Sequence, residues 1–259
     1  MSVPLAYNEY GAGPPLVIVH GLFGSSRNWH VVAERLSDKR HVMAVDLRNH
    51  GRSPWAQPMT YSEMVDDLSI FLDARGIDRA TIIGHSVGGK MAMLFALLYG
   101  QMVDALVVVD IAPIQYTHTL LPYVQAMQRV DLAECARRSD VEAKLALGVP
   151  DGELRKFLMQ NLVRRDGVYA WRLHLEAIGA YMDDLIGFPA TPELEYSGPT
   201  LFVSGEESDY VEPRHHDAIR SFFPHAEFAG ISDAGHRVHA DQPEQFMAHI
   251  RKFLERAES

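Results

Sequence analysis

The chain has 259 residues and carries 34 Asp and Glu against 24 Lys and Arg, which gives a formal net charge of −10. This length accommodates one α/β unit or two small domains, and an acidic surface repels phosphate backbones, so we expect no nucleic-acid partner. A lone cysteine, Cys135, excludes an intrachain disulfide. No basic segment leads into an apolar one at the N-terminus, and no run of about 18 apolar residues occurs. We therefore expect a cytoplasmic protein without stable membrane insertion.

Short β-branched or aliphatic runs recur along the chain and are typical of strands buried on both faces of a sheet. They alternate with helical patterns: Thr60 to Glu63 form a capping box ahead of an apolar stripe, and Phe246 to Leu254 carry another stripe. The alternation predicts an α/β fold with a mostly parallel sheet, helices on both faces and a ligand site beyond the carboxyl ends of the strands. The predicted strands cover residues 16–19, 41–45, 80–83, 106–109, 201–203 and 226–231.

Residues 84–89 read Gly-His-Ser-Val-Gly-Gly, between a strand-like run and a helix-like stretch from Met91 to Tyr99. In a G-x-S-x-G turn of this kind the residues at Gly84 and Gly88 must be small, because the backbone passes close to its neighbours. The same turn lifts one hydroxyl clear of the surface. The pattern therefore predicts Ser86 as a nucleophile.

A serine hydroxyl is a poor nucleophile by itself, so Ser86 needs a nearby base and a group that orients the base. His236 lies in the polar loop SDAGHRVH after the last predicted strand, where the chain order serine, acid, histidine places the base. Asp110 directly follows the strand at 106–109. Its carboxylate would reach the His236 loop at the same sheet edge, so Asp110 is the first candidate for the acid.

The interval from Ile114 to about Ser197 breaks the alternation and contains no clear strand. Apolar residues within 154–162 predict one amphipathic helix, with Asp151 as its N-cap, and residues 171–186 suggest another. We therefore expect an insertion made of helices.

Two basic pairs stand out in this acidic chain, Arg137–Arg138 and Arg164–Arg165. Such pairs are usually solvated. The sharper alternative is that one of them contacts the phosphates of an acyl-CoA.

Five linked motifs occur in order along nearly the whole chain, and together they are far more specific than any one of them. With them the sequence resembles the α/β-hydrolases, and more narrowly the esterase and thioesterase branch that contains the YbfF-like esterases and their mitochondrial relatives. The resemblance implies a core domain of residues 1–112 and 198–259, and a helical cap of residues 113–197 inserted after the sixth strand. The motifs are HGLFGS at 20–25, DLRNHGRSP at 46–54, GHSVGG at 84–89, VVDIAP at 108–113 and AGHRVHAD at 234–241.

The resemblance also implies further site residues. The backbone amides of Leu22 and Val87 would form an oxyanion hole, with Phe23 as an alternative for the first donor. In many relatives the acid follows the next strand, which makes Asp209 a competitor of Asp110, and Glu176 is a weaker third option. His20 is expected to brace its loop and not to act as a second base.

These features predict a serine hydrolase that cleaves small-molecule carboxylic esters or thioesters through an acyl-enzyme intermediate. The alternatives are a hydrolase-fold ligand-binding protein with little turnover and a cofactor-free perhydrolase. No P-loop, G-x-G-x-x-G, H-E-x-x-H or CxxC pattern occurs, so we expect neither a cofactor nor a metal. Oligomeric state, acyl length and the choice between ester and thioester stay open.

Overall fold

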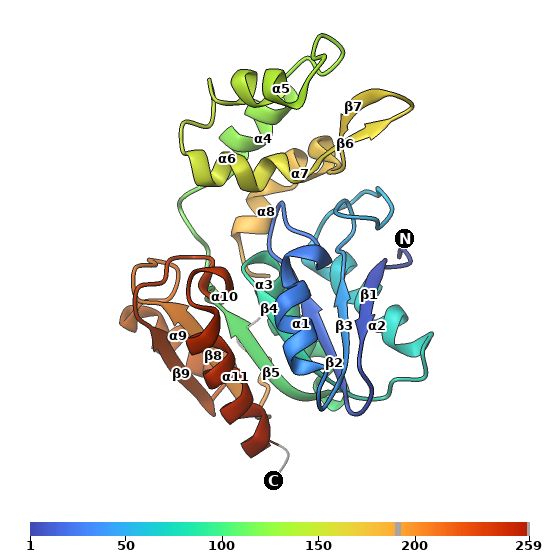
Figure 1. The fold of residues 1–259 in the computed structure, drawn as a ribbon. Coiled ribbons are helices and arrows are strands. Elements are labelled where there is room, and N and C mark those ends of the chain that lie inside the picture. The colour runs from blue at the N-terminus through green and yellow to red at the C-terminus, as the bar shows by residue number, and fades with distance from the viewer. Residues whose placement is uncertain (190–192, 258–259) are drawn as a thin grey trace.

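The computed structural model describes residues 1–189 and 193–257. Seven strands form one sheet in the order β1-β3-β2-β4-β5-β8-β9 (Figure 1), in which β1 is antiparallel to β3 and the other neighbouring pairs are parallel. The strands of this sheet are β1 (Tyr7–Tyr10), β2 (Pro15–Val19), β3 (His41–Val45), β4 (Ala80–His85), β5 (Val103–Val109), β8 (Thr200–Gly205) and β9 (Ala226–Ile231).

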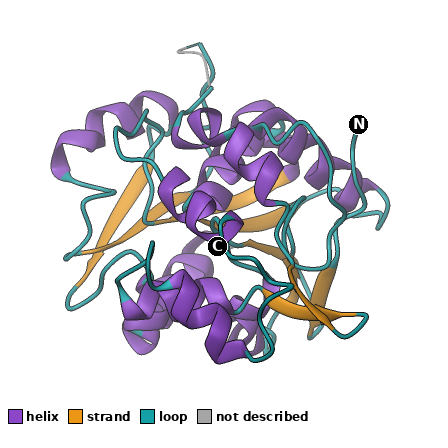
Figure 2. Ribbon diagram, turned by 90° about the horizontal axis from the view of Figure 1, so that it is seen from above, coloured by secondary structure: helices purple, strands orange, loops and turns teal. Residues whose placement is uncertain are grey.

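Helices cover both faces of the sheet, as Figure 2 shows from above. On one face, α1 (His30–Leu36), α10 (Val238–Asp241) and α11 (Pro243–Ala257) bury a core with one set of strand side chains. The opposite face packs α2 (Tyr61–Asp73), α3 (Val87–Leu98) and α9 (His216–Phe222) against the alternate set. Short 3-10 turns are η1 (Ser26–Trp29), η2 (Gly100–Met102) and η3 (Pro213–His215).

Among the residues that the structure describes, no helix is both long and apolar enough to cross a membrane.

The predicted strands are confirmed, and two of them, β3 and β9, have the predicted bounds. The predicted helix after Thr60 is α2, and the Thr60 hydroxyl accepts a hydrogen bond from the Glu63 amide at 3.4 Å. The Glu63 carboxylate pairs with Arg48 at 3.1 Å. Thr60 therefore caps the N-terminus of α2, while the Glu63 carboxylate binds Arg48 of the neighbouring loop.

The elements from α4 to α8 within the segment 113–197 lie above the carboxyl edge of the sheet (Figure 1), and they differ from the prediction in one respect. The segment contains an antiparallel hairpin of β6 and β7, so the expectation of no strand is wrong. The sequence does hold a hairpin signal, because Asp166 and Gly167 form the two-residue turn with φ of 52° and 85°. The elements of the segment are α4 (Leu121–Gln128), α5 (Arg138–Leu145), α6 (Gly152–Met159), β6 (Leu162–Arg165), β7 (Val168–Trp171), α7 (Leu175–Ala180) and α8 (Met182–Ile186).

Two boundaries inside this segment also change. The predicted helix at 154–162 is α6, whose N-cap Asp151 accepts from the amides of Glu153 and Leu154 at 2.8 and 2.9 Å as expected, but Leu162 belongs to β6. The predicted helix at 171–186 is divided into α7 and α8, and Trp171 ends β7. In this chain the segment follows β5, the fifth strand and not the sixth, since three strands precede β4.

Candidate active site

The turn between β4 and α3 holds Ser86 in a strained conformation, with φ of 52° and ψ of −123°. A Cβ atom on Gly84 would lie 2.3 Å from the Gly88 carbonyl oxygen, and a Cβ on Gly88 would lie 2.4 Å from that of His20. Side chains at these two positions would therefore collide with backbone. The strain at Ser86 persists because strand and helix fix the residues on both sides.

Asp110 and His236 form a close pair at the same sheet edge. Asp110 follows β5 with φ of 51°, its side chain is fully buried, and its Oδ2 accepts a hydrogen bond from His236 Nδ1 at 2.8 Å. The same oxygen accepts from the Ser208 hydroxyl, and Oδ1 accepts from the Gly205 amide at 3.2 Å. The His236 side chain is 32% exposed. These contacts fix the proton on Nδ1 of His236 and leave Nε2 as the ring nitrogen that can accept one.

The two other acid candidates lie elsewhere. Asp209, in the loop after β8, and Glu176, on α7, are both exposed. The residue that this loop contributes to the carboxylate is Ser208, the neighbour of Asp209, through its hydroxyl. Of the three predicted acids, Asp110 is therefore the one in hydrogen-bond contact with His236.

Ser86 and His236 are brought together through shared neighbours. His85, next to Ser86, donates from Nε2 to the His236 carbonyl at 2.8 Å, and the two imidazole rings lie 4.7 Å apart. Tyr210 lines the same cavity as Ser86 and stacks on the His236 ring at 4.0 Å. Within residues 1–189 and 193–257, no hydrogen bond joins Ser86 to His236, a contact that commonly tightens only when substrate binds.

The predicted oxyanion-hole residues lie beside Ser86. Leu22 and Val87 line the cavity that Ser86 also lines, and a Cβ on Gly21 would lie 3.0 Å from the Ser86 Cβ. The Phe23 amide, the alternative donor, is engaged with His50 Nε2 at 3.2 Å. This contact favours Leu22 over Phe23 as a donor toward the cavity.

Two buried histidines support the Leu22 loop. His20 donates from Nδ1 to the Gly21 carbonyl at 2.8 Å and accepts the Leu47 amide on Nε2 at 3.0 Å, so both ring nitrogens are used. Burial lowers the pKa of His20, and burial lowers that of His50 to about 3. His20 is thus neutral at pH 7 and braces the loop, in agreement with its predicted role.

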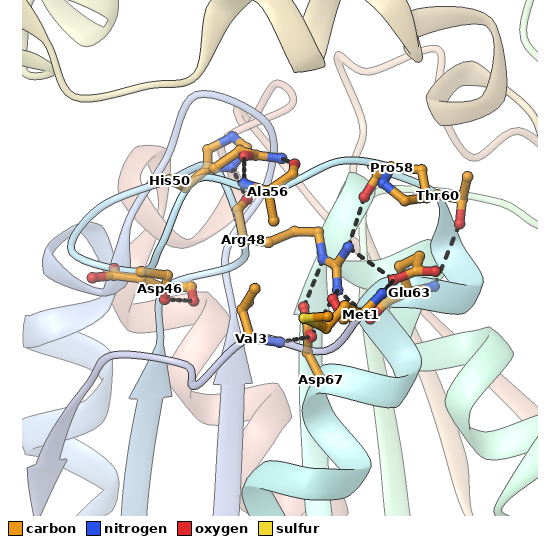
Figure 3. A network of polar contacts seen from close by, with 12 residues as sticks. Met1, Val3, Asp46, Arg48, His50, Ala56, Pro58, Thr60, Glu63 and Asp67 are labelled. Carbon is orange, nitrogen blue, oxygen red and sulfur yellow. Dashed lines mark hydrogen bonds and ion pairs between the residues drawn. The ribbon is translucent and has the colours of Figure 1, made fainter.

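The adjacent loop from Asp46 to Pro54 is anchored by a buried arginine (Figure 3). The Arg48 guanidinium contacts both carboxylate oxygens of Asp67 at 2.7 and 2.8 Å and the Pro58 carbonyl at 2.6 Å. Gly51 has φ of 55°, and a Cβ there would lie 2.2 Å from the Asp46 carboxyl carbon. These contacts hold the loop against α2, so its charged residues form a scaffold.

Lys90 lies one helical turn after Ser86 and is only 1% exposed. Its ammonium donates to the carbonyls of Ile114, Ile186 and Gly187 at 2.9, 2.7 and 2.6 Å. Burial lowers the pKa of Lys90 to about 7. One side chain of α3 therefore binds the start of the segment 113–197 and the residues at the end of α8.

The cavity beside Ser86 has a volume of about 30 Å³. That is roughly the volume of one water molecule in the liquid. Most of its wall is apolar and comes from the segment 113–197 and the loop before it. An acyl chain would need this wall to move apart. The cavity is lined by Leu22, Ser86, Val87, Lys90, Ile111, Tyr116, His118, Leu120, Met182, Leu185, Ile186 and Tyr210.

Sequence reasoning missed His85, Lys90, Ser208 and Tyr210, whose roles depend on contacts between distant segments. The one local signal was the lysine that follows the glycine pair at 88–89 in an otherwise apolar helix. Within the described residues, no three neighbouring His, Cys, Asp or Glu side chains are placed to hold a metal ion.

Comparison with known proteins places the chain in a family. A family model described as alpha/beta hydrolase fold matches residues 14–243. A Danio rerio protein named sn-1-specific diacylglycerol lipase ABHD11 is 40% identical over 98% of this chain and 83% of its own length. Esterase YbfF of Escherichia coli (strain K12) is 35% identical, with 96% of each chain covered.

Solved structures agree with this family. A structure titled "Marine microorganism esterase" superposes with a TM-score of 0.94 and 35% identity, covering 97% of this chain and all of its own. The cap boundaries and site residues are not tested by these similarities and stay predictions. The chain belongs to the α/β-hydrolase family, in the branch of the YbfF-like esterases, and is a hydrolase of the esterase and lipase type.

Proposed function

We propose that this protein is a serine hydrolase that cleaves carboxylic esters or thioesters with the triad Ser86, His236 and Asp110. The observation that carries the proposal is the 2.8 Å bond between His236 Nδ1 and the buried Asp110 carboxylate, at the sheet edge where Ser86 occupies a strained turn. This combination matches what a nucleophile, its base and an orienting acid require.

In the proposed reaction, His236 Nε2 takes the proton of the Ser86 hydroxyl as the oxygen attacks the acyl carbon. The negative charge that develops on the carbonyl oxygen is stabilised by the amides of Leu22 and Val87. His236 then gives its proton to the departing alcohol or thiol, which leaves an acyl-Ser86 ester. Water, deprotonated by His236, hydrolyses that ester and restores Ser86.

We further propose that residues 113–197 act as a cap over a core of residues 1–112 and 198–259. The apolar residues that this segment contributes to the cavity would contact the acyl chain. Similarity to proteins named esterase and sn-1-specific diacylglycerol lipase supports an ester of an aliphatic acid as substrate. A cytoplasmic location stays part of this proposal.

A substrate panel tests the proposal. p-Nitrophenyl esters and acyl-CoA thioesters of increasing chain length are assayed with the wild type and with Ser86→Ala. We expect turnover that varies with chain length in the wild type and is lost in the variant. Binding without turnover by the wild type would favour the ligand-binding alternative, and equal turnover by both proteins would contradict the role of Ser86.

A further inference from the structure

A second hollow lies apart from Ser86, between the loop at 51–55 and the hairpin of β6 and β7. It is an open groove of about 580 Å³ and shares no lining residue with the cavity beside Ser86. Its four charged lining residues are all arginines, namely Arg52, Arg164, Arg165 and Arg172. The net charge of the chain is −10, so the groove is a positively charged region on an acidic protein.

The four arginines differ in how they are paired. Arg52 lies 3.7 Å from the Asp46 carboxylate, and Arg164 donates to the Ala136 carbonyl at 3.2 Å. The guanidinium groups of Arg165 and Arg172, by contrast, make no hydrogen bond or ion pair with any residue in the described ranges. Two cations are therefore left available at one site.

Arg172 is the more constrained of these two cations, because it is only half-exposed. Burial lowers the pKa of its guanidinium, and the charge of Arg27 lowers it further. Asp46 opposes this effect, and Arg165 and Arg52 add to it. Crowded cations of this kind cost free energy unless an anion neutralises them.

The wall of the groove is held in place by Trp55. Its indole Nε1 donates to the Arg172 carbonyl at 2.9 Å, and its ring stacks on His174 at 4.7 Å with an interplanar angle of 5°. The Arg165 guanidinium lies 5.4 Å from the centre of the same ring. The loop and the hairpin are thus joined through the Arg172 backbone, and both cations line the groove that the two elements form.

We propose that this groove binds a phosphate group through Arg165 and Arg172. The planar forks of two guanidinium groups match the oxygens of a phosphate, and a phosphate monoester carries close to two negative charges where a carboxylate carries one. The phosphate can belong to a soluble metabolite or to a phospholipid headgroup. The site is independent of the chemistry proposed for Ser86.

The basic pair Arg137–Arg138 serves as a matched control. Arg137 forms an ion pair with Asp140 at 3.2 Å, and Arg138 donates to the Met159 carbonyl at 2.7 Å. Both side chains are therefore engaged in α5 and its surroundings. A double change of this pair to glutamine alters the net charge by the same amount as a change at Arg165 and Arg172.

Intrinsic fluorescence provides the binding signal. Of the three tryptophans, Trp29 and Trp171 are buried, whereas Trp55 is 47% exposed and lines the groove. Inorganic pyrophosphate and glycerol 3-phosphate are titrated at constant ionic strength, and calorimetry repeats the titration with the wild type and both double variants. We expect saturable binding that weakens at least about tenfold in Arg165→Gln/Arg172→Gln, a loss of about 1.4 kcal/mol or more. In Arg137→Gln/Arg138→Gln we expect no weakening.

Cosedimentation with vesicles distinguishes the two sources of the phosphate. Binding to phosphatidic acid vesicles that is absent with phosphatidylcholine alone and lost in the groove variant assigns a lipid headgroup, and binding of the soluble anions alone assigns a metabolite. Absence of binding in both arms, or equal weakening in both double variants, overturns the proposal. Circular dichroism checks the fold of each variant, and Arg165→Gln alone replaces the double variant if that one unfolds.

Discussion

The carboxyl edge of the main sheet and the segment 113–197 face each other across Ser86, yet they are held by different kinds of contact. At the sheet edge the backbone itself is fixed: Ser86 donates its amide to Val109 at 3.0 Å, and Asp110 donates its amide to Val203 at 2.8 Å. The segment shares an apolar core with α2 and α3. Beside backbone bonds such as that from His174 to Asn49 at 3.1 Å, its polar links to the rest of the chain depend on side chains such as Lys90 and Asn161.

This difference separates two properties of the molecule. Residues at the sheet edge set the geometry of the reacting groups, so we expect changes there to act on the rate of the chemical step. The side chains that bind the segment, such as Lys90 and Asn161, set the position of the cavity wall. We therefore expect changes at these residues to alter the stability of the protein and its preference for acyl length. The following experiments test that division.

The largest effect is expected from Ser86→Ala, which removes the proposed nucleophile. Turnover of a short-chain p-nitrophenyl ester should fall by about 10⁶-fold, the scale seen when a triad loses its nucleophile. The variant should unfold at the same temperature as the wild type within about 2 °C, because alanine keeps the Cβ atom and the strained turn, and the Ser86 hydroxyl makes no hydrogen bond with any described residue. Retention of most activity would contradict the triad.

Asp110→Asn should lower kcat by about 10⁴-fold, because an amide cannot stabilise the imidazolium and favours the wrong tautomer of His236. Asp209→Asn is the matched control, since its carboxyl is exposed in the same part of the structure. We expect a change of less than about threefold there. Losses of equal size in the two variants would remove Asp110 from its proposed role.

Lys90→Met should weaken the attachment of the segment at its start and at the end of α8, since three carbonyls lose their donor. A carbonyl left buried without a partner costs roughly 1–3 kcal/mol. We expect a lower unfolding midpoint in urea and a shift in the preferred acyl length, with kcat for the best substrate changed less than in Asp110→Asn. An unchanged acyl preference would count against the role of this lysine in placing the wall.

The same variant carries a pH signature. Burial lowers the pKa of Lys90 from 10.5 to about 7, so between these values the wild type takes up a proton when it unfolds. Its unfolding free energy should therefore rise with pH in that window relative to Lys90→Met, by at most about 1.4 kcal/mol per pH unit. Below pH 7 the difference should be flat. Lys156→Met, at an exposed ion pair, should not show this dependence.

The smallest effect is expected from Asn161→Ala. This buried side chain donates to the Phe23 carbonyl at 2.8 Å and connects the start of the hairpin to the loop that carries Leu22. Its loss should cost about 1–3 kcal/mol of unfolding free energy and lower kcat only modestly. Gln160→Ala, the exposed neighbour, should stay within about 0.5 kcal/mol of the wild type.

The sheet edge was predictable because its constraints are local. A glycine on each side of a serine, and an aspartate directly after a β-branched run, indicate backbone geometry that neighbouring residues impose, and these predictions agree with the turn at Ser86 and with the partner of His236. Within the segment the same reasoning correctly predicted Asp151 as the N-cap of α6 but missed the hairpin of β6 and β7. The signal of that hairpin, the dipeptide Asp166-Gly167 between two short strands, was overlooked.

The roles of His85 and Lys90 could not be predicted, for a different reason. Both groups bind backbone carbonyls that are about 25 to 150 residues away along the chain, and any residue type can supply a carbonyl. No side-chain pattern therefore marks these partners. Burial of a charged or titratable residue beside the turn becomes visible only when the segments are assembled.

The Lys90 amine holds together two stretches of the chain, one shortly after β5 near Ile114 and one directly after α8 near Gly187. The elements α4 to α8 form an excursion between these two points. An excursion whose two ends meet in this way can grow, shrink or be exchanged without forcing β5 and β8 apart, since those strands stay paired below it. Changes in α4 to α8 alone can thus alter which ligands fit the cavity, while the strands of the main sheet keep their pairing.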